Sequence, residues 1–325
     1  MPPRDDLREA AAELEGSVVV CGVGDYADTV AAVASSDSRF VGMSEFVAAV
    51  GPSTAAVDEA SAVGGEAGVG SPAAVVIAVD PSGSSTGAEP PIEAVEEADA
   101  VLEAIDATGA FTVAVVPGCG ASADDLSALG ERVDAVLLAG DGSESVDAGA
   151  VTDADAVADA IRTFLAVVQE PGFVNLDLTD AETVLSSGTA ALGVGSGARD
   201  APSVAVDDAF SSLPTDVDPT DASAVLVDVV VDPVTSIAAA TDAIAAVRER
   251  IGVDANVIWG GAVDESAAAE LTVRVVVADV RHAPVLDAGD PCPRCDAPLS
   301  AYAFGASETL SCDACGYSGI SMRRD

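Results

Sequence analysis

Two groups of residues in this sequence have the types and the spacing that chemistry requires. The first is the segment 175–180, Asn-Leu-Asp-Leu-Thr-Asp, which places two carboxylates three residues apart after a Pro-Gly turn and an amide. The second is a pair of Cys-x-x-Cys motifs near the end of the chain. Carboxylates at this spacing are either the solvated start of a helix or groups that take part in chemistry. The segment alone leaves both interpretations open.

The cysteine motifs predict a structural metal site. Two Cys-x-x-Cys pairs bring four thiolates into tetrahedral reach, which is the arrangement that zinc prefers. Such a closed site has no open position for a substrate, so it predicts a zinc ribbon rather than a catalytic centre. Disulfides are the alternative, and a reducing cytoplasm disfavours them. The four predicted ligands are Cys292, Cys295, Cys312 and Cys315.

Two glycine-bearing loops are candidate phosphate cradles. Gly22 and Gly24 form a G-x-G turn after an apolar run, where a phosphate could meet a helix N-terminus. The segment 80–90 also follows an apolar run and combines glycines with small hydroxyls, although Pro81 removes one backbone donor. These residues fit an anion cradle and an ordinary Gly/Ser loop equally well.

The composition predicts a cytoplasmic protein of a high-salt cell. The chain of 325 residues has 55 acids and 13 bases, all of them arginine, and a net charge of -42. In molar salt the Debye length is about 3 Å, so this charge is screened. The negative electrostatic field of the whole chain repels phosphate, which argues against a general nucleic-acid binder. The ribbon is then the one surface where nucleic acid could bind. We see no signal peptide and no membrane span, and expect a soluble protein.

The first half of the chain predicts an α/β fold with a doubly wound, mostly parallel sheet. Strands that are apolar on both faces alternate with helical segments, and such sheets bind ligands at the carboxyl ends of their strands. A long central helix is expected at 152–170. The predicted strands are 17–24, 73–80, 111–118 and 133–140, and the predicted helices are 92–107 and 122–131.

The second half predicts an α+β unit, in which the order of strands and helices differs from that of the first half. Strands and helices alternate less regularly there, and the last two strands are expected to form a hairpin through 264–266. The predicted strands are 188–193, 222–231, 255–263 and 270–280, and the predicted helices are 203–211 and 234–251.

Two segments of the chain resemble those of a known protein family. The segment 171–195 resembles the co-catalytic loop, helix and strand of the FtsZ branch of the tubulin superfamily, and 252–265 resembles its late strand and turn. The resemblance covers 171–280, and upstream segments are collinear with it. The ribbon occupies the place of the family's partner-binding tail.

The resemblance implies a function for both kinds of loop. Members of this family bind GTP or GDP with Mg²⁺ in the first domain and stack head to tail, and the loop of one subunit completes the active site on the next subunit's nucleotide. It therefore implies that the acidic loop positions the attacking water through Asn175, Asp177 and Asp180. It implies phosphate contacts by Gly22, Gly24, Gly83, Ser84, Thr86 and Gly87.

The phosphate signature also departs from the family. Pro81, Ser82 and Ser85 stand where the family has glycines, and each adds bulk where the backbone must approach a phosphate. The arginine-bearing loop and the guanine-contacting asparagine are not recognisable. These departures count against tight GTP binding by this chain.

The sequence therefore predicts a divergent FtsZ-like protein, a pseudo-GTPase that caps or modulates filaments of a genuine FtsZ-type partner. An active, self-assembling GTPase is the first alternative, and a zinc-ribbon binding module on an FtsZ-like scaffold is the second. The expected parts are a degenerate nucleotide-binding domain at 1–150, the central helix at 151–171, the C-terminal α+β domain at 172–280, a linker at 281–291 and the zinc ribbon at 292–325.

Overall fold

The apolar runs of the first half form parallel strands, as predicted. β1 (Val18–Gly22), β3 (Ala74–Ala78), β4 (Phe111–Val116) and β5 (Ala135–Leu138) pair in this order. A short strand, β2 (Ser38–Phe40), adds parallel to β1 and was not predicted. The computed structural model describes residues 17–23, 26, 30–31, 33, 38–40, 72–79, 109–118, 123–140, 153–186, 188–214, 217–266, 270–280, 289, 297–304, 307–314 and 318–320.

These strands are buried because their side chains are small and apolar on both faces. β1, β3 and β5 are buried throughout. Cys21 is fully buried in β1, and burial raises the pKa of its thiol to about 12, so it is a core residue rather than a reactive one.

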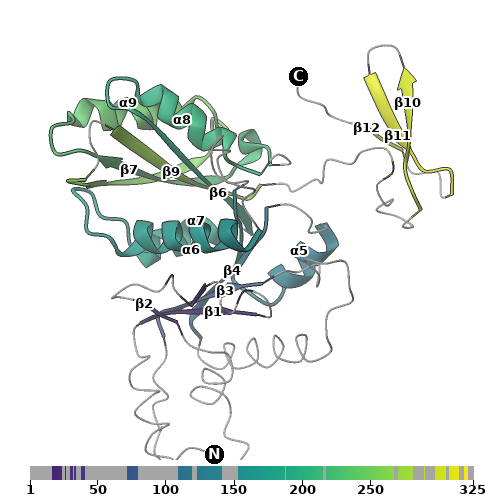
Figure 1. The fold of residues 1–325 in the computed structure, drawn as a ribbon, viewed down its shortest axis with the longest axis horizontal. Coiled ribbons are helices and arrows are strands. Elements are labelled where there is room, and N and C mark those ends of the chain that lie inside the picture. The colour runs from purple at the N-terminus through teal and green to yellow at the C-terminus, as the bar shows by residue number, and fades with distance from the viewer. Residues whose placement is uncertain are drawn as a thin grey trace, which may run out of the picture.

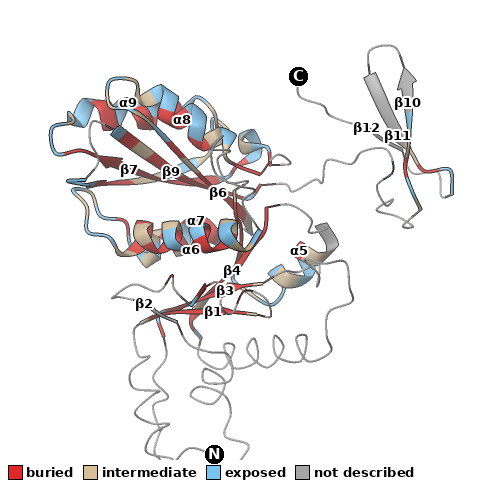
Figure 2. Cartoon of the chain, viewed as in Figure 1, coloured by how far each residue is buried: buried red, intermediate tan, exposed pale blue. Residues whose placement is uncertain are grey.

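The central helix and the helix that follows it lie inside the molecule. α6 (Asp153–Gln169) and α7 (Leu178–Leu185) lie between β1–β4 and the strands of the second half, as Figures 1 and 2 show. One apolar core joins α6 to both sides, since Phe164 packs in the same cluster as Leu137 of β5 and Leu226 of the second half. The predicted central helix is thus confirmed.

The strands of the second half continue the same sheet. β6 (Thr189–Ala198) pairs parallel with β5, β9 (Glu270–Ala278) is antiparallel to β6 and to β7 (Ala224–Val231), and β8 (Asn256–Val263) is parallel to β7. The full order is β2-β1-β3-β4-β5-β6-β9-β7-β8. The predicted mixed α/β architecture with a mostly parallel sheet is therefore confirmed.

The predicted hairpin between the last two strands is wrong. β8 and β9 run in opposite directions, but β7 lies between them. The reason is burial. Every residue of β7 is buried, and this strand therefore takes the inner position. β8 is only partly buried and lies at the edge of the sheet.

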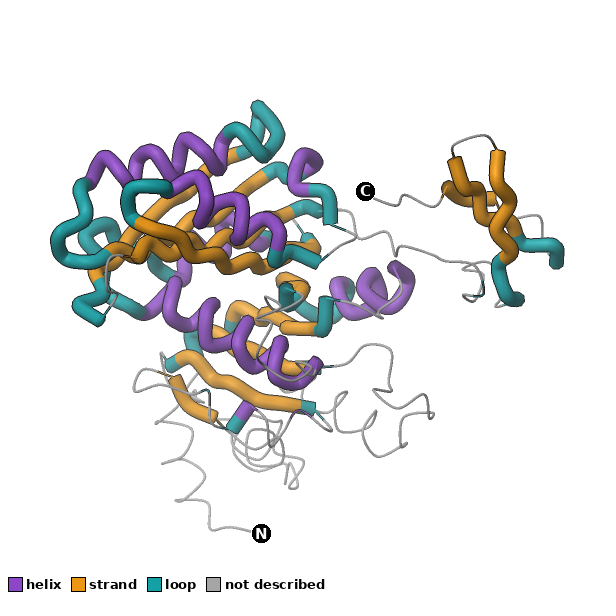
Figure 3. Tube along the Cα trace, turned by 45° about the horizontal axis from the view of Figure 1, so that its top comes forward, coloured by secondary structure: helices purple, strands orange, loops and turns teal. Residues whose placement is uncertain are grey.

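Helices contact both faces of the sheet. α5 (Ala123–Gly130) contributes Leu126 to a second core with Val136 and Leu138, on the face of β5 that does not contact α6. α8 (Pro202–Ser211) and α9 (Ile237–Arg248) belong to the same second core, and Figure 3 shows these layers in a tilted view. The doubly wound connections stay a prediction, because the segments between β1 and β4 and the predicted helix 92–107 lie mostly outside the described residues.

A separate antiparallel sheet follows near the end of the chain. It consists of β10 (Ser300–Phe304), β11 (Ser307–Ser311) and β12 (Ser318–Ile320), in sequence order. Cys312 is buried directly after β11. No helix in the described part of the chain is long and apolar enough to cross a membrane.

Glycines in β6 allow α8 to approach its backbone. A side chain at Gly195 would overlap the backbone of Ala205 and Ala209. We expect Gly195→Ala to destabilise the protein by roughly 1–3 kcal/mol, since overpacking forces the helix away from the strand. Denaturant unfolding in molar KCl measures this change.

Gly130 provides the matched control for that substitution. A side chain there would have only one neighbour, a methyl of Val136 at 4.0 Å, and alanine suits a helix better than glycine. Gly130→Ala should leave stability unchanged or slightly higher. Equal stability of the two variants would contradict the close packing of α8 on β6.

Candidate functional site

The acidic loop connects α6 to α7 and ends in a capping box. Asp177 is the N-cap of α7, and its Oδ1 accepts a hydrogen bond of 3.0 Å from the backbone N–H of Asp180. In return, the Asp177 N–H donates to Asp180 Oδ2 at 3.1 Å. This reciprocal arrangement satisfies donors that the helix start leaves unpaired. The structural interpretation of these acids is therefore correct, and it does not exclude a chemical one.

Each carboxylate uses one oxygen for the capping box and keeps the other outside it. Asp177 is exposed and Asp180 is partly exposed. Asn175 is exposed too, and its Oδ1 accepts a hydrogen bond of 2.8 Å from the N–H of Gly172, which closes the turn before the helix. The structure thus brings the three predicted loop residues together on one exposed, hydrogen-bonded turn.

The loop is seated on the edge of the sheet through β8. Val174 and Gly261 exchange two backbone hydrogen bonds, of 3.3 and 2.9 Å, in an isolated antiparallel bridge. Side chains at Gly260 and Gly261 would overlap Leu176 and Phe173, respectively. Because neighbouring residues of a strand point to opposite faces, Leu176 and Phe173 hold the edge from both sides. The two glycines are what make room for the loop.

A partly buried ion cluster lies beside this contact. Arg274 of β9 donates from Nη1 to Asp228 Oδ2 at 3.1 Å and to Glu170 Oε2 at 3.4 Å. Asp228 is paired in register with Arg274 and is 6% exposed. Burial raises the pKa of Asp228, and the neighbouring Arg274 opposes that rise. Sequence reasoning missed this cluster, although an aspartate and an arginine within apolar strand runs were a usable signal.

The raised pKa of Asp228 has a defined consequence for stability. Its carboxyl adds stability below its unfolded pKa, and that contribution is lost as pH rises through the folded pKa. Asp228→Asn imitates the protonated form, so its stability relative to the wild type should increase as pH rises from about 3.8. Unfolding free energies between pH 3.5 and 7.5 in molar KCl test this. A difference that is independent of pH would contradict the burial effect.

The described residues include one end of the predicted phosphate site. Gly22 is the last residue of β1 and is paired with Ala78 at the end of β3, and the N–H of Val23 donates to Ala78 O at 2.9 Å. The two predicted loops therefore leave the sheet from adjacent carboxyl ends of strands. The other predicted contacts, Gly24, Gly83, Ser84, Thr86 and Gly87, lie outside the described residues.

Of the predicted zinc ligands, Cys312 alone lies within the described residues, and Cys292, Cys295 and Cys315 do not. The described part of the chain contains no group of three or more His, Cys, Asp or Glu residues that could hold a metal ion. The zinc site therefore stays a prediction.

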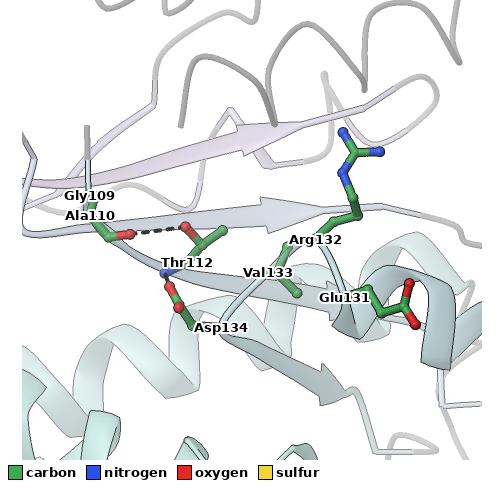
Figure 4. Close-up of a pocket in the computed structure, with 7 residues that line it drawn as sticks. All are labelled: Gly109, Ala110, Thr112, Glu131, Arg132, Val133 and Asp134. Carbon is green, nitrogen blue, oxygen red and sulfur yellow. Dashed lines mark hydrogen bonds between the residues drawn. The ribbon is translucent and has the colours of Figure 1, made fainter. Parts of the chain in front are cut away.

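A hollow of about 280 Å³ lies at the amino ends of β4 and β5 (Figure 4). Two of its polar side chains are already hydrogen-bonded, since Asp134 Oδ2 accepts from the Thr112 N–H at 2.7 Å and Thr112 Oγ1 donates to Ala110 O at 3.1 Å. Ligands of α/β sheets bind at the opposite, carboxyl ends of the strands. We assign no ligand to this hollow.

Comparisons with known proteins agree with this architecture. The model of the FtsZ family C-terminal domain matches residues 188–281. The chain is 35% identical over 124 residues to cell division protein FtsZ 1 of Halobacterium salinarum, covering 37% of this chain and 31% of the relative. It is 32% identical over 124 residues to FtsZ of Haloferax mediterranei, covering 37% and 33%. These alignments span about a third of each curated relative.

Solved structures extend the likeness of the fold over most of the chain. An empty FtsZ dimer of M. jannaschii has a TM-score of 0.57 at 20% identity, covering 85% of this chain and 92% of that one. A GTPγS-bound protofilament of CetZ2 from Haloferax volcanii has a TM-score of 0.56 at 18% identity, covering 82% and 94%. Residues 188–281 therefore match the FtsZ C-terminal domain, and the fold of most of the chain is similar to that of FtsZ and CetZ.

The structure relates two motifs that lie far apart in the sequence. The segment 171–180 and residues 260–261 of β8 are the two sides of one contact, the seat of the acidic loop on β8. The acidic loop and the predicted phosphate loops lie in separate parts of the chain. Only the first of these lies fully within the described residues.

Proposed function

We propose that this protein is an FtsZ-like component of a division or cytoskeletal filament system and acts as a pseudo-GTPase. Its acidic loop would dock onto the nucleotide of a genuine FtsZ-type subunit and cap or modulate that partner's filament. The observation that carries this proposal is the exposed capping box of Asp177 and Asp180 on an anchored turn. The predicted phosphate loop, in contrast, has Pro81 and Ser82 where the resembling family has glycines.

An apolar surface beside the loop supports a protein partner. We name it the loop-end patch: exposed apolar side chains from the acidic loop, from the end of β8 and from the segment that leads from β7 into α9. Exposed apolar side chains grouped in this way indicate an interaction surface. The patch consists of Phe173 (42% exposed), Val234 (75%), Ile237 (69%) and Val263 (49%). A subunit seated on the patch would meet the acidic loop at the same time.

Similar proteins indicate the kind of assembly. The CetZ2 structure is described as a GTPγS-bound protofilament, and the M. jannaschii structure as an FtsZ dimer. The proposed partner is therefore a nucleotide-bearing subunit of FtsZ type, contacted head to tail. The acidic composition supports a place for this protein in a high-salt cytoplasm.

The loop's own groups suit the orientation of a water molecule. In hydrolysis of a nucleoside triphosphate, the γ-phosphate is attacked by water that a polar or carboxylate side chain positions. The carboxylate oxygens of Asp177 and Asp180 outside the capping box can accept hydrogen bonds from this water, and the capping box keeps both side chains in place. Asn175 shapes the turn that presents them. The nucleotide and its Mg²⁺ belong to the partner.

This proposal is tested by restoring hydrolysis in trans. The partner is an FtsZ subunit, such as that of Halobacterium salinarum, in which the acids of its own co-catalytic loop are replaced by alanine. Adding the wild-type protein in molar KCl should restore GTP turnover at filament ends and shorten the filaments. Asp177→Asn should lower the restored turnover about 10²-fold or more, since general-base groups contribute that much. Phosphate release and light scattering measure both effects.

The choice of asparagine separates chemistry from folding. Asparagine is as good an N-cap as aspartate, whereas Asp177→Ala also loses about 1 kcal/mol of helix stability. Asp218→Asn is the matched control, because Asp218 caps the short helix η1 (Pro219–Asp221) before β7, at the end of that strand away from Gly261. The proposal fails if the wild type changes neither turnover nor filament length. GTP turnover by the protein alone would favour the self-assembling GTPase instead.

The second candidate is a zinc-ribbon binding module, by which the protein would contact a further protein or nucleic acid. The favouring observation is the separate sheet β10–β12 with Cys312 buried directly after β11. The thiolates of Cys292, Cys295, Cys312 and Cys315 would hold the ion, which would supply structure and no catalysis.

Metal analysis tests the ribbon. We expect one zinc per chain in protein purified without chelators, and loss of that zinc in Cys312→Ser, because three thiolates bind the ion less tightly. Cys21→Ser is the control, since Cys21 is buried in β1 and should not affect zinc content. A zinc-free wild type would contradict the prediction.

A further inference from the structure

One arginine connects three elements beneath the acidic loop. Arg274 lies within β9, Asp228 within β7, and Glu170 directly after the last residue of α6. The Arg274 and Asp228 side chains are 18% and 7% exposed, and that of Glu170 is 54% exposed. A single nitrogen, Nη1, donates to both carboxylates. The end of the central helix is therefore joined to the inner strands by charge as well as by apolar packing.

The same row of residues continues to the other end of the loop. Asp228 is paired in register with Gly260 of β8, and Leu176 rests on Gly260. Residues paired in register point to the same face of a sheet. The row of Arg274, Asp228 and Gly260 thus lies beneath both ends of the loop, with Glu170 at the α6 end and Leu176 at the α7 end.

We propose that Arg274 is a positioning residue for the acidic loop. Through Glu170 it sets where α6 ends over the sheet, and therefore where the loop begins. Apolar contacts between α6 and the sheet are non-directional, whereas a charge-assisted hydrogen bond has a defined geometry. The Arg274 side chain is 18% exposed, so salt screens this contact less than a pair that is exposed at both ends. Its effect on a partner's nucleotide rests on the proposed function; the seating of the loop does not.

The decisive variant replaces the buried pair by apolar residues. Exchanging a buried ion pair for apolar side chains of similar volume is often neutral or stabilising, so Asp228→Leu with Arg274→Met should fold while Glu170 loses its partner. The amide protons of Gly172 and Val174 are hydrogen-bonded within the loop or to β8, and their exchange reports its seating. We expect them to exchange about tenfold faster in the double variant, as expected for a locally loosened segment.

A second readout comes from the only tryptophan. Trp259 lies two residues before Gly261 in β8 and is partly buried, so its emission maximum should shift to longer wavelength when the loop loosens. Both measurements use the full chain without a partner. They are independent of any GTP turnover.

Three further variants separate positioning from general stability. Arg274→Lys keeps a cation that can donate to both carboxylates from one nitrogen. This variant should therefore retain wild-type exchange and emission. Glu170→Gln keeps the buried pair, does not endanger folding, and should raise exchange about two- to threefold, as expected for a partly exposed ion pair. Arg250→Met is the matched control, because Arg250 joins the end of α9 to the exposed Asp207 of α8, two helices that pack in the second core, and should leave the loop unchanged.

Each outcome decides the inference. Wild-type exchange and emission in the folded double variant and in Glu170→Gln would overturn it. Loss of wild-type exchange and emission in Arg274→Lys would overturn it too. Faster exchange in the double variant, with no turnover in trans by the wild type, would support the seating by Arg274 and reject the proposed function. Faster exchange together with lower turnover in trans than the wild type would support both.

Discussion

The rest of this structure depends on the contact between the acidic loop and the edge strand β8. Gly260 and Gly261 leave space for Leu176 on one face and Phe173 on the other, and Val174 adds two backbone hydrogen bonds at the edge itself. An edge strand presents unpaired backbone groups, and here the loop uses them. Without this seat, the turn before α7 would have no fixed relation to the sheet, and the capping box would present its acids at no defined place.

The seat connects to the layered core through the central helix. α6 lies between the strands of the two halves, and its apolar side chains share one cluster with both. The core is built mainly from small aliphatic side chains, because the sequence contains few aromatic residues. Small side chains permit close approach of helix and strand, as at Gly195 beneath α8. They specify the lateral position of a helix weakly, which makes the directional contact of Arg274 with Glu170 more important.

Helix capping and chemistry are compatible in the acidic loop. The capping box uses one oxygen of Asp177 and one of Asp180, and it fixes both side chains in a single conformation. Preorganised carboxylates are better positioned for a reacting water than mobile ones. For these two acids, a role as a helix cap and a role as a hydrolytic group therefore do not exclude each other. A residue can cap its own helix and act on a neighbouring subunit.

The sequence by itself determined the local features of this protein. Apolar runs predicted the positions of the strands, helical spacing predicted α5, α6, α8 and α9, and the two acids at 177 and 180 left a helix start as one of two interpretations. Each of these depends on residues close together in the chain. Only the tertiary structure decided which strand is central, since β7 and β8 have similar runs and differ in what covers them. It also decided that Asp228, Arg274 and Glu170 meet, and that Gly260 lies beneath Leu176, because these contacts join residues dozens of positions or more apart.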